Sequence, residues 1–390
     1  MKALAIIFWI FAFVIFYTYV GYGMLAYLLV ALKERFGKKS FHPTGEYKPD
    51  VTLLIAAYNE EDIIEEKMEN CRSLIYPAGK LHITWVTDGS TDGTVSKLSA
   101  YGDVTIIHDP RRGGKTAALN HAMEHITTPI VVLTDANTYL NPECIELIVR
   151  EFEDPRTGCV SGEKRVRSTD SDNAAGTEGF YWKYESFLKD LDSRLYSTQG
   201  AAGELFAIRR ELWKPMGTDT LLDDFICSME IAASGYKIAY CKDAYALESP
   251  SLDIREESKR KRRIAAGGLQ SVWRLRRLMN PLRYGMLSFQ FVSHRVLRWC
   301  ITPSLLFLEL PLNIALLWSG KPLLYGILLA CQLAFYALAL YGMAADRKGR
   351  KTRIAKVAYY FLFMNVNTFR GMAYLASHRG NGAWEKAKRS

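Results

Sequence analysis

The sequence lacks the cysteine and glycine patterns that mark several common kinds of site. Its seven cysteines include no C-x-x-C pair, which argues against a zinc cluster or a disulfide framework and favours a reducing compartment. No G-x-G-x-x-G follows an apolar strand, so a dinucleotide fold is not indicated. The loop that ends at Lys115 has Asp109 where a Walker loop requires glycine, so that motif is absent as well.

Charged residues are missing from a long stretch near the start, between Leu4 and Leu32. This stretch is longer than the apolar core of a signal peptide and long enough to span a bilayer, and no A-x-A-like cleavage site is evident. We therefore predict a transmembrane helix over residues 1–32, with a cleaved signal as the alternative. The basic linker of residues 33–49 then places the next domain in the cytoplasm by the positive-inside rule.

Basic residues gather beside the apolar segments, and 50 Lys and Arg against 41 Asp and Glu give a net charge of +9. This arrangement favours contact with an anionic lipid surface over nucleic-acid binding. We predict two further spans, Cys300–Trp318 and Leu323–Ala344. The next apolar segment, Val357–Ala376, is interrupted by polar residues and either spans, re-enters or lies at the interface.

The segment that precedes these spans, Phe289–Arg298, mixes apolar and basic residues. We predict an interfacial helix there, with His294, Arg295 and Arg298 directed towards the lipid headgroups.

Between the apolar segments, short apolar strands alternate with helical stretches. We predict strands over Val51–Ala57, His82–Val86 and Val104–Ile107, and a fourth that begins at Val131 and runs into an acidic turn that carries Asp135. This alternation predicts right-handed βαβ units and a parallel sheet whose loops share one edge. Open α/β sheets bind ligands beyond the carboxyl ends of their strands, so that edge is the predicted site.

The loops at this edge carry candidate binding residues. Asp135 and Asn137 offer oxygen ligands two residues apart, which suits Mg²⁺ or Mn²⁺ with substrate phosphates; a helix cap is the alternative. Asp88 can accept a hydrogen bond from the imide N–H of a pyrimidine, with a plain turn as the alternative. Lys115 follows two glycines and suits a phosphate, with a solvated helix N-terminus as the alternative.

Four motifs occur in order: A-x-Y-N-E at residues 56–60, D-G-S-T-D-G-T at 88–94, G-G-K-x-x-A-L-N at 113–120 and T-D-A-N-T at 134–138. Together they resemble the membrane-bound family 2 glycosyltransferases, in particular bacterial synthases of the cellulose, chitin-oligosaccharide, hyaluronan and poly-N-acetylglucosamine type. The resemblance implies a GT-A-like α/β nucleotide-sugar transferase domain with a mostly parallel sheet, flanked by transmembrane helices.

The same resemblance assigns roles to residues of these loops. It places Asp135 and Asn137 at the metal-diphosphate, although the family pattern often has Asp at the second position. An amide oxygen ligates the ion with less charge, so Asn137 acts either directly or through water or the ribose. The residues implied for the nucleotide and diphosphate are Ala57, Tyr58, Glu60, Asp88, Lys115 and Asp135.

Asp223 and Asp224 precede an apolar-periodic helix and resemble the T-E-D motif, whose final Asp is the catalytic base. This implies Asp224 as the base, with Asp223 beside it raising its basicity by like-charge repulsion. Inverting transfer requires a base because the incoming hydroxyl loses its proton as it attacks. An N-cap pair on a surface helix is the alternative.

A basic run at residues 259–263 resembles the Q/R-x-x-R-W motif, with Ile264 in place of the aromatic residue. The resemblance implies that Arg260 and Arg263 contact the diphosphate; a lipid-binding patch is the alternative. Residues 200–210 resemble an acceptor-side stretch that ends in two arginines. The aromatic side chains of residues 178–195 either stack on a sugar or pack in the core.

We therefore predict a metal-dependent inverting hexosyltransferase that moves a sugar from a UDP-sugar to a growing β-linked polysaccharide at the bacterial inner membrane. The multi-pass chain has a cytoplasmic catalytic domain at residues 50–255, an interface segment at 256–298 and a C-terminal transmembrane region at 299–390. The acceptor is a glycan or a lipid, and a partner membrane protein for export is left open. The alternatives are a single transfer to a lipid or lipid-linked acceptor, and an inactive sugar-binding scaffold.

Overall fold

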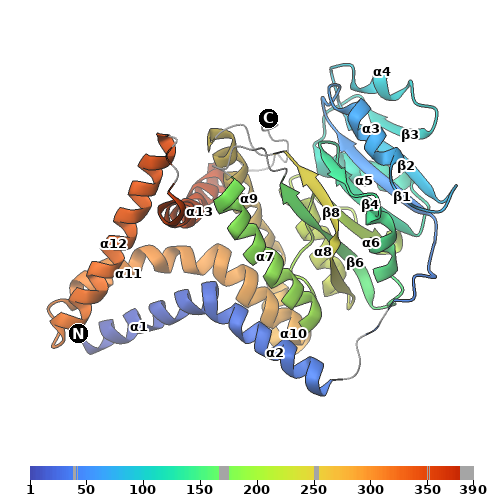
Figure 1. Ribbon diagram of the computed structural model, residues 1–390. Coiled ribbons are helices and arrows are strands. Elements are labelled where there is room, and N and C mark those ends of the chain that lie inside the picture. Colours follow the sequence, from blue (N-terminus) through green and yellow to red (C-terminus); the bar gives the residue numbers. More distant parts are fainter. Residues whose placement is uncertain are drawn as a thin grey trace.

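The computed structural model describes residues 1–37, 41, 43–166, 175–249, 254–348, 350 and 352–377. Its polar part is an α/β domain built on one mixed sheet, and its apolar part is a group of long helices on one side of that domain (Figure 1). The predicted α/β class with flanking apolar helices is confirmed.

The sheet has eight strands: β1 Val51–Ala57, β2 Leu81–Asp88, β3 Val104–Asp109, β4 Ile130–Asp135, β5 Thr138–Leu140, β6 Thr157–Val166, β7 Leu205–Arg209 and β8 Lys237–Glu248. Their order is β3-β2-β1-β4-β7-β6-β8-β5. The four strands predicted from the sequence form a parallel half, and β6 is parallel to β8. β7 runs antiparallel between β4 and β6, and β5 runs antiparallel to β8. The sheet is therefore mixed. The carboxyl ends of its parallel strands β1, β2, β3 and β4 all lie along one edge of it.

Helices cover both faces of the sheet. Those of the α/β domain are α3 Ile64–Arg72, α4 Thr94–Leu98, α5 Lys115–His125, α6 Cys144–Glu151, α7 Ala175–Leu195, α8 Asp223–Ala233 and α9 Ile254–Arg274. In β1, Leu53 and Ile55 belong to the core on the side of α3 and α6, whereas Leu54 belongs to the core on the side of α5 and α8. All three side chains are fully buried. A strand covered on both faces needs apolar residues at consecutive positions, which explains the unbroken apolar run.

The long apolar segments form α1 Lys2–Phe16, α2 Tyr22–Phe36, α10 Pro281–Gln290, α11 Thr302–Leu316, α12 Pro322–Arg347 and α13 Arg353–Ser377. The π-helical segments η1 Tyr17–Gly21 and η4 Phe291–Ile301 join α1 to α2 and α10 to α11. Within the described ranges, three helical segments are long and apolar enough to cross a membrane: Lys2–Phe36, Pro281–Leu316 and Pro322–Arg347. They include the predicted N-terminal span and most of the two predicted C-terminal spans.

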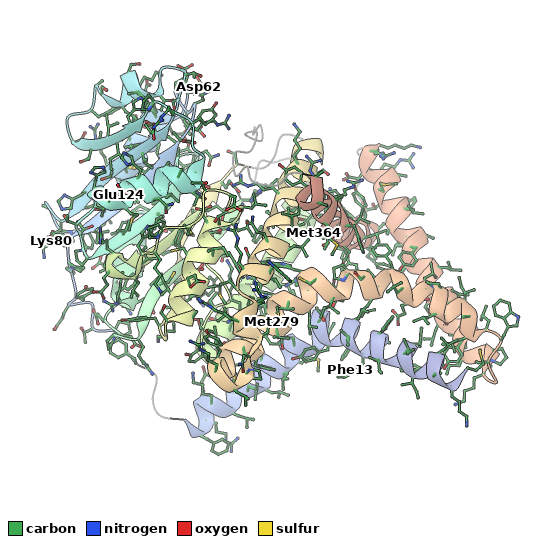
Figure 2. The ribbon with its side chains drawn as sticks, turned by 180° about the vertical axis from the view of Figure 1, so that it is seen from behind. Phe13, Asp62, Lys80, Glu124, Met279 and Met364 are labelled. Atoms are coloured by element: carbon green, nitrogen blue, oxygen red, sulfur yellow. The ribbon has the colours of Figure 1, made fainter. Side chains whose placement is uncertain are left out.

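The outer faces of these helices are apolar. Figure 2 shows Phe13 on α1 at the edge of the molecule, and 65% of this residue is exposed. On α12, Leu323 is 78% exposed. Such apolar exposure suits lipid contact better than contact with water.

The segment predicted to lie at the membrane interface is instead buried against the α/β domain. His294 and Arg295 in η4 are 1% and 7% exposed. His294 Nδ1 lies 2.6 Å from an oxygen of Asp192, and Arg295 and Arg298 donate to Glu185 at 2.8 and 2.9 Å. The prediction that these side chains face the headgroups is wrong, because α7 places two carboxylates opposite them and buried charges need such partners.

Candidate active site

All eleven residues predicted for the site line one cavity of about 710 Å³, within the range of roughly 300–1,000 Å³ that is usual for small-molecule sites. The cavity lies beyond the carboxyl ends of β1, β2 and β4, and α9, η4 and α13 contribute to its other walls. The eleven residues are Ala57, Tyr58, Glu60, Asp88, Lys115, Asp135, Asn137, Asp223, Asp224, Arg260 and Arg263.

The loop after β1 contains a left-handed residue. Asn59 has a φ of 53°, in a region that asparagine adopts more readily than most residues. Its side-chain oxygen accepts from the N–H of Thr91 at 2.8 Å, and its own N–H donates to Ser90 Oγ at 3.1 Å. The neighbouring Tyr58 lines the cavity, with the Arg112 guanidinium 4.0 Å from the centre of its ring. The left-handed backbone of Asn59 and its hydrogen bonds to Ser90 and Thr91 therefore fix one wall of the predicted nucleotide site.

Asp88, predicted to recognise a base, holds the glycine loop that precedes α5. Its two carboxylate oxygens accept from the N–H groups of Gly113 and Gly114 at 2.7 and 2.8 Å. The loop also passes close to Gly89, where a Cβ would lie 2.6 Å from the backbone nitrogen of Arg112. Glycine is therefore required at that position. Each carboxylate oxygen can accept another hydrogen bond, so recognition of a base remains a prediction.

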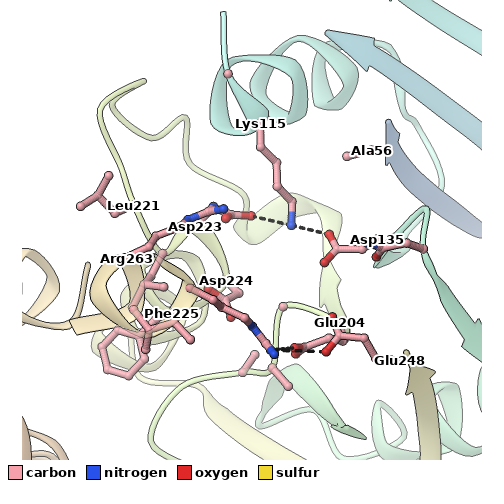
Figure 3. Close-up of a pocket in the computed structure, with 18 of the residues that line it drawn as sticks. Ala56, Lys115, Asp135, Glu204, Leu221, Asp223, Asp224, Phe225, Glu248 and Arg263 are labelled. Carbon is pink, nitrogen blue, oxygen red and sulfur yellow. Dashed lines mark hydrogen bonds and ion pairs between the residues drawn. The ribbon is translucent and has the colours of Figure 1, made fainter. Parts of the chain in front are cut away.

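Lys115 lies between two acidic side chains. Its Nζ is 2.7 Å from Asp135 Oδ1 and 3.6 Å from Asp223 Oδ2 (Figure 3). Burial disfavours the charge on Lys115, but Asp135 and Asp223 outweigh burial and raise the pKa of the lysine above its ordinary value. The lysine is therefore a fixed positive charge at the predicted diphosphate site.

Asp135 and Asn137 have the donor atoms that a divalent cation requires. Within the described part of the chain, Asn137 Oδ1 and Asp223 Oδ2 are buried and accept no hydrogen bond. Asp223 Oδ2 still has the charge of Lys115 at 3.6 Å, whereas no hydrogen bond compensates for the burial of the Asn137 amide oxygen, and a hard cation satisfies such an oxygen directly. The residues present therefore fit Mg²⁺ or Mn²⁺, with Asp135 as the carboxylate ligand.

Asp224 stands at the start of α8 and is partly exposed to the cavity. Burial and the neighbouring Asp223 raise the pKa of Asp224 to about 7, against the lowering effect of Lys115. A Cβ on Gly203 would lie 3.0 Å from Asp224 Oδ2, so glycine leaves room beside the carboxylate. A carboxylate with a pKa near neutrality is well suited to accept a proton.

Arg260 pairs with two glutamates. Its Nη2 lies 3.2 Å from Glu204 Oε1 and 3.3 Å from Glu248 Oε2, and Lys164 contacts both carboxylates. Burial opposes the charge on Glu204, but Lys164 and Arg260 outweigh it and lower the pKa of Glu204. We call these four side chains the buried ion cluster. The sequence reasoning missed three of its members, although Glu204 stands out as a charged residue among small ones.

The two predicted arginines thus lie in different parts of the cavity. Figure 3 shows Arg263 on the side of Asp223, away from Glu204 and Glu248. Arg263 is therefore better placed than Arg260 to act with Lys115 on one anion.

The acceptor-side stretch and the aromatic helix contribute only in part. Residues 201–204 line the cavity, but Arg209 and Arg210 donate to backbone carbonyls elsewhere, through their Nε atoms at 2.8 and 3.0 Å. In α7, Trp182 lines the cavity, whereas Tyr184 donates to a backbone carbonyl of the N-terminal helix at 2.7 Å. The arginine pair therefore supports the fold, and a single described aromatic residue of α7 reaches the cavity.

The sheet, the cavity and the apolar helices define a class of protein, the glycosyltransferases built on a GT-A-like domain. The structure is similar to a mannosyltransferase from Pyrobaculum calidifontis that was solved with GDP-Man and Mn²⁺, with a TM-score of 0.70 and 26% sequence identity. The similarity covers 93% of this chain and 97% of that one, so it extends into the apolar helices.

Residues 52–216 match the family model described as Glycosyl transferase family 2. The predicted resemblance to family 2 glycosyltransferases is confirmed over these residues. It is 26% identical over 197 residues to a poly-beta-1,6-N-acetyl-D-glucosamine synthase of Staphylococcus aureus, covering 49% of this chain and 47% of that protein. For the protein of that name from Staphylococcus epidermidis, identity is 23% over 245 residues, with 59% and 58% covered. The chain thus matches about half the length of these relatives.

Proposed function

We propose that the protein is a metal-dependent, inverting hexosyltransferase that moves a sugar from a nucleotide sugar, with a UDP-sugar as the expected donor, to an acceptor hydroxyl beside Asp224. The observation that carries the proposal is the single cavity shared by Asp224 and the loops after β1, β2 and β4. A donor held by those loops would have its sugar in the same cavity as the carboxylate.

The proposed reaction is a one-step displacement at the anomeric carbon. The acceptor oxygen forms a bond to that carbon as the bond from the carbon to the diphosphate oxygen breaks, and the hydroxyl proton passes to the Asp224 carboxylate. The pKa of Asp224 of about 7 makes this carboxylate a better proton acceptor than an ordinary aspartate, while a large part of it remains deprotonated at neutral pH.

Positive charge for the leaving diphosphate comes from Lys115 and Arg263 in this proposal. Lys115 is already fixed beside Asp135, so little reorganisation is needed when the diphosphate is released. Asp135 and Asn137 would hold Mg²⁺ or Mn²⁺, and a bound ion would supply further positive charge to the diphosphate.

As the product we propose a β-linked polysaccharide, because the curated relatives carry the name of a polysaccharide synthase. The catalytic domain is then on the cytoplasmic side of a bacterial inner membrane, as Lys33 and Arg35 in the last turn of α2 favour. Export of such a polymer would involve a partner membrane protein.

A second candidate is the transfer of a single sugar to a lipid or lipid-linked acceptor. It is favoured by how much of each chain is covered by the similarity to the solved mannosyltransferase and by the similarity to the polysaccharide synthases. The likeness to the solved mannosyltransferase covers nearly the whole of both chains, whereas the similarity to the polysaccharide synthases covers about half of them.

The test uses the purified full-length protein with Mg²⁺ or Mn²⁺ and a panel of UDP-sugars, with GDP-mannose included. Release of the nucleoside diphosphate is measured for each donor, and any product is sized by mass spectrometry. A long glycan from one donor supports the polymer, and a singly glycosylated acceptor supports the second candidate. Release from none of the donors contradicts the proposed enzyme.

A further inference from the structure

A fully buried lysine lies beside the loop that carries the proposed metal ligands. We call residues 135–138 the metal loop, because Asp135 and Asn137 are the proposed ligands. Lys67 of α3 is fully buried, and its Nζ donates to the backbone carbonyl of Thr138, the last residue of the metal loop. Lysine is rarely buried without a partner, and this lysine does not line the cavity. The proposed reaction therefore does not explain why it is there.

Thr138 connects this lysine to both proposed ligands. Its hydroxyl donates to the carbonyl of Asp135 at 2.9 Å and lies 2.9 Å from Thr134 Oγ1. The Thr138 side chain thus closes the turn that contains Asp135 and Asn137, while the Thr138 carbonyl accepts from Lys67. Thr138 itself is fully buried. A displacement of its carbonyl would therefore move the end of the metal loop and, with it, the two ligands.

The same helix holds the strand that begins at the end of the metal loop. β5 is the last strand in the order of the sheet and pairs with β8. Asn70 of α3 donates to the carbonyl of Leu140 in β5 at 2.8 Å and accepts from its N–H at 2.9 Å. Tyr139 donates to Glu66 of α3 at 2.8 Å. Side chains of α3 therefore bind backbone groups of this edge strand that a further strand would otherwise bind.

The position of the ligands is especially important for this metal loop. Asn137 offers a neutral amide oxygen, so one of the two proposed ligands attracts a cation with less charge than a carboxylate would. Mg²⁺ also requires nearly ideal octahedral geometry. Groups that orient metal ligands without touching the ion typically change its affinity by about 10–100-fold. A loop with one carboxylate and one amide should therefore depend strongly on the groups that hold it.

We propose that α3 holds the metal loop in the conformation that binds the ion, and that Lys67 is its main positioning residue. This inference rests on the proposed function, because it concerns the ion that Asp135 and Asn137 would hold. Lys67 acts through the Thr138 carbonyl and contacts neither the ion nor the donor. The loss of its hydrogen bond should therefore weaken the binding of the ion and leave the nucleotide loops as they are.

The experiment measures binding and does not depend on turnover. UDP and GDP are titrated calorimetrically into the full-length protein in lipid nanodiscs, once in EDTA and then at a series of Mn²⁺ concentrations without EDTA. The nucleotide that binds more tightly should gain affinity as Mn²⁺ is added. The quantity compared between variants is the Mn²⁺ concentration that produces half of this gain, which we call the Mn²⁺ midpoint.

Two variants of α3 weaken its hold on the loop. Lys67→Met keeps a side chain of similar length without the donor, so it should raise the Mn²⁺ midpoint about tenfold and leave the nucleotide Kd in EDTA unchanged. Asn70→Ala removes the two hydrogen bonds to Leu140 and should raise the midpoint by a smaller factor. The matched control is Met68→Ala, because Met68 is also buried in α3 but packs in the apolar core. This control should lower the unfolding temperature and leave the midpoint unchanged.

The outcomes distinguish this inference from the proposed function. An unchanged Mn²⁺ midpoint in Lys67→Met overturns the inference, and so does an equal rise in Met68→Ala. A lower midpoint in Lys67→Met also overturns it, because Lys67 would then act through a charge that repels the ion.

Two further results are decisive. If Lys67→Met shows no cooperative unfolding transition, Asn70→Ala decides, and an unchanged midpoint there overturns the inference. Nucleotide binding that is equally tight in EDTA and in Mn²⁺ overturns the inference while the donor site stands. Binding of neither nucleotide contradicts the proposed function itself, and the inference with it.

Discussion

The two ends of the cavity are constructed in different ways. The donor end consists of loops that follow parallel strands. Hydrogen bonds between backbone N–H groups and side chains fix these loops, as between the glycine loop and the Asp88 carboxylate. Another wall consists of side chains from α9, η4 and α13, which only helix packing brings together. Loops at one sheet edge are neighbours whenever their strands are. The two ends of the cavity are therefore built by separable parts of the molecule.

The two ends of the cavity also differ in the charged side chains that line them. Lys115, Asp135 and Asp223 concentrate charge of both signs at the donor end, whereas α9, η4 and α13 contribute arginines together with apolar side chains. The buried ion cluster contributes a further charged part of the cavity lining. A substitution at the donor end should therefore change the rate or the ion requirement.

The largest effect is expected from Asp224→Asn at the donor end. The change removes the proton acceptor and preserves the shape of the side chain, so kcat should fall about 10²–10⁴-fold while the donor Kd stays the same. Initial rates of nucleoside diphosphate release and calorimetric donor binding measure the two quantities. Glu230→Gln on the same helix, which alters an exposed pair with Arg277, is the control. Full activity in Asp224→Asn contradicts the assignment of the base.

Breaking the buried ion cluster should mainly affect stability. Lys164→Met removes a 1% exposed cation that contacts both Glu204 and Glu248. Removal of one partner from a buried ion pair costs about 3–5 kcal/mol, so the protein should unfold at a clearly lower temperature. Lys97→Met, which breaks an exposed pair with Glu65, should cost about 0–1 kcal/mol. Equal unfolding temperatures of the two variants would show that the cluster is not stabilising.

A smaller effect is expected on the metal-ion concentration that the enzyme needs for half-maximal rate. Chelation with EDTA should abolish transfer in the wild type, and Mn²⁺ or Mg²⁺ should restore it. Asn137→Ala removes one of two proposed ligands, so the Mn²⁺ concentration for half-maximal rate should rise about 10-fold. Asp109→Asn, at the end of strand β3, should leave that concentration unchanged. Transfer that persists in EDTA is the result that rejects the metal site.

The smallest effect is a shift of the pH profile. Asp224 accepts a proton only when it is deprotonated, and its raised pKa means that kcat should increase as the pH rises through about 7. Asp223→Asn removes a neighbouring negative charge that raises this pKa, so the increase should move to lower pH. The measurement is kcat as a function of pH at saturating donor. An unchanged profile, or a shift to higher pH, is inconsistent with the proposed coupling of the two carboxylates.

The donor end was largely predictable because its signals are local. Asp88 and Asp135 each end an apolar strand, and parallel pairing brings such ends to one edge. The buried ion cluster was not predictable in this way. Lys164 and Glu248 lie on β6 and β8, and their contact depends on a parallel pairing that no turn sequence indicates.

The amphipathic segment Phe289–Arg298, before the C-terminal spans, shows most clearly what the sequence alone could not predict. Its pattern indicated a polar face around His294 and Arg295, but headgroups and protein carboxylates both satisfy such a face. The side chains of α7 decide between the two, through Asp192 and Glu185.

By itself, the sequence determined the α/β class, the apolar helices and the loops that line the donor end, because strand periodicity and strand-end chemistry are properties of neighbouring residues. Only the tertiary structure decided that Arg260 pairs with glutamates, that η4 is buried and that Trp299 packs against Phe225. Each of these contacts joins residues far apart in the chain. These contacts depend on how the helices pack and on which charges become buried, and the order of residues along the chain does not show either.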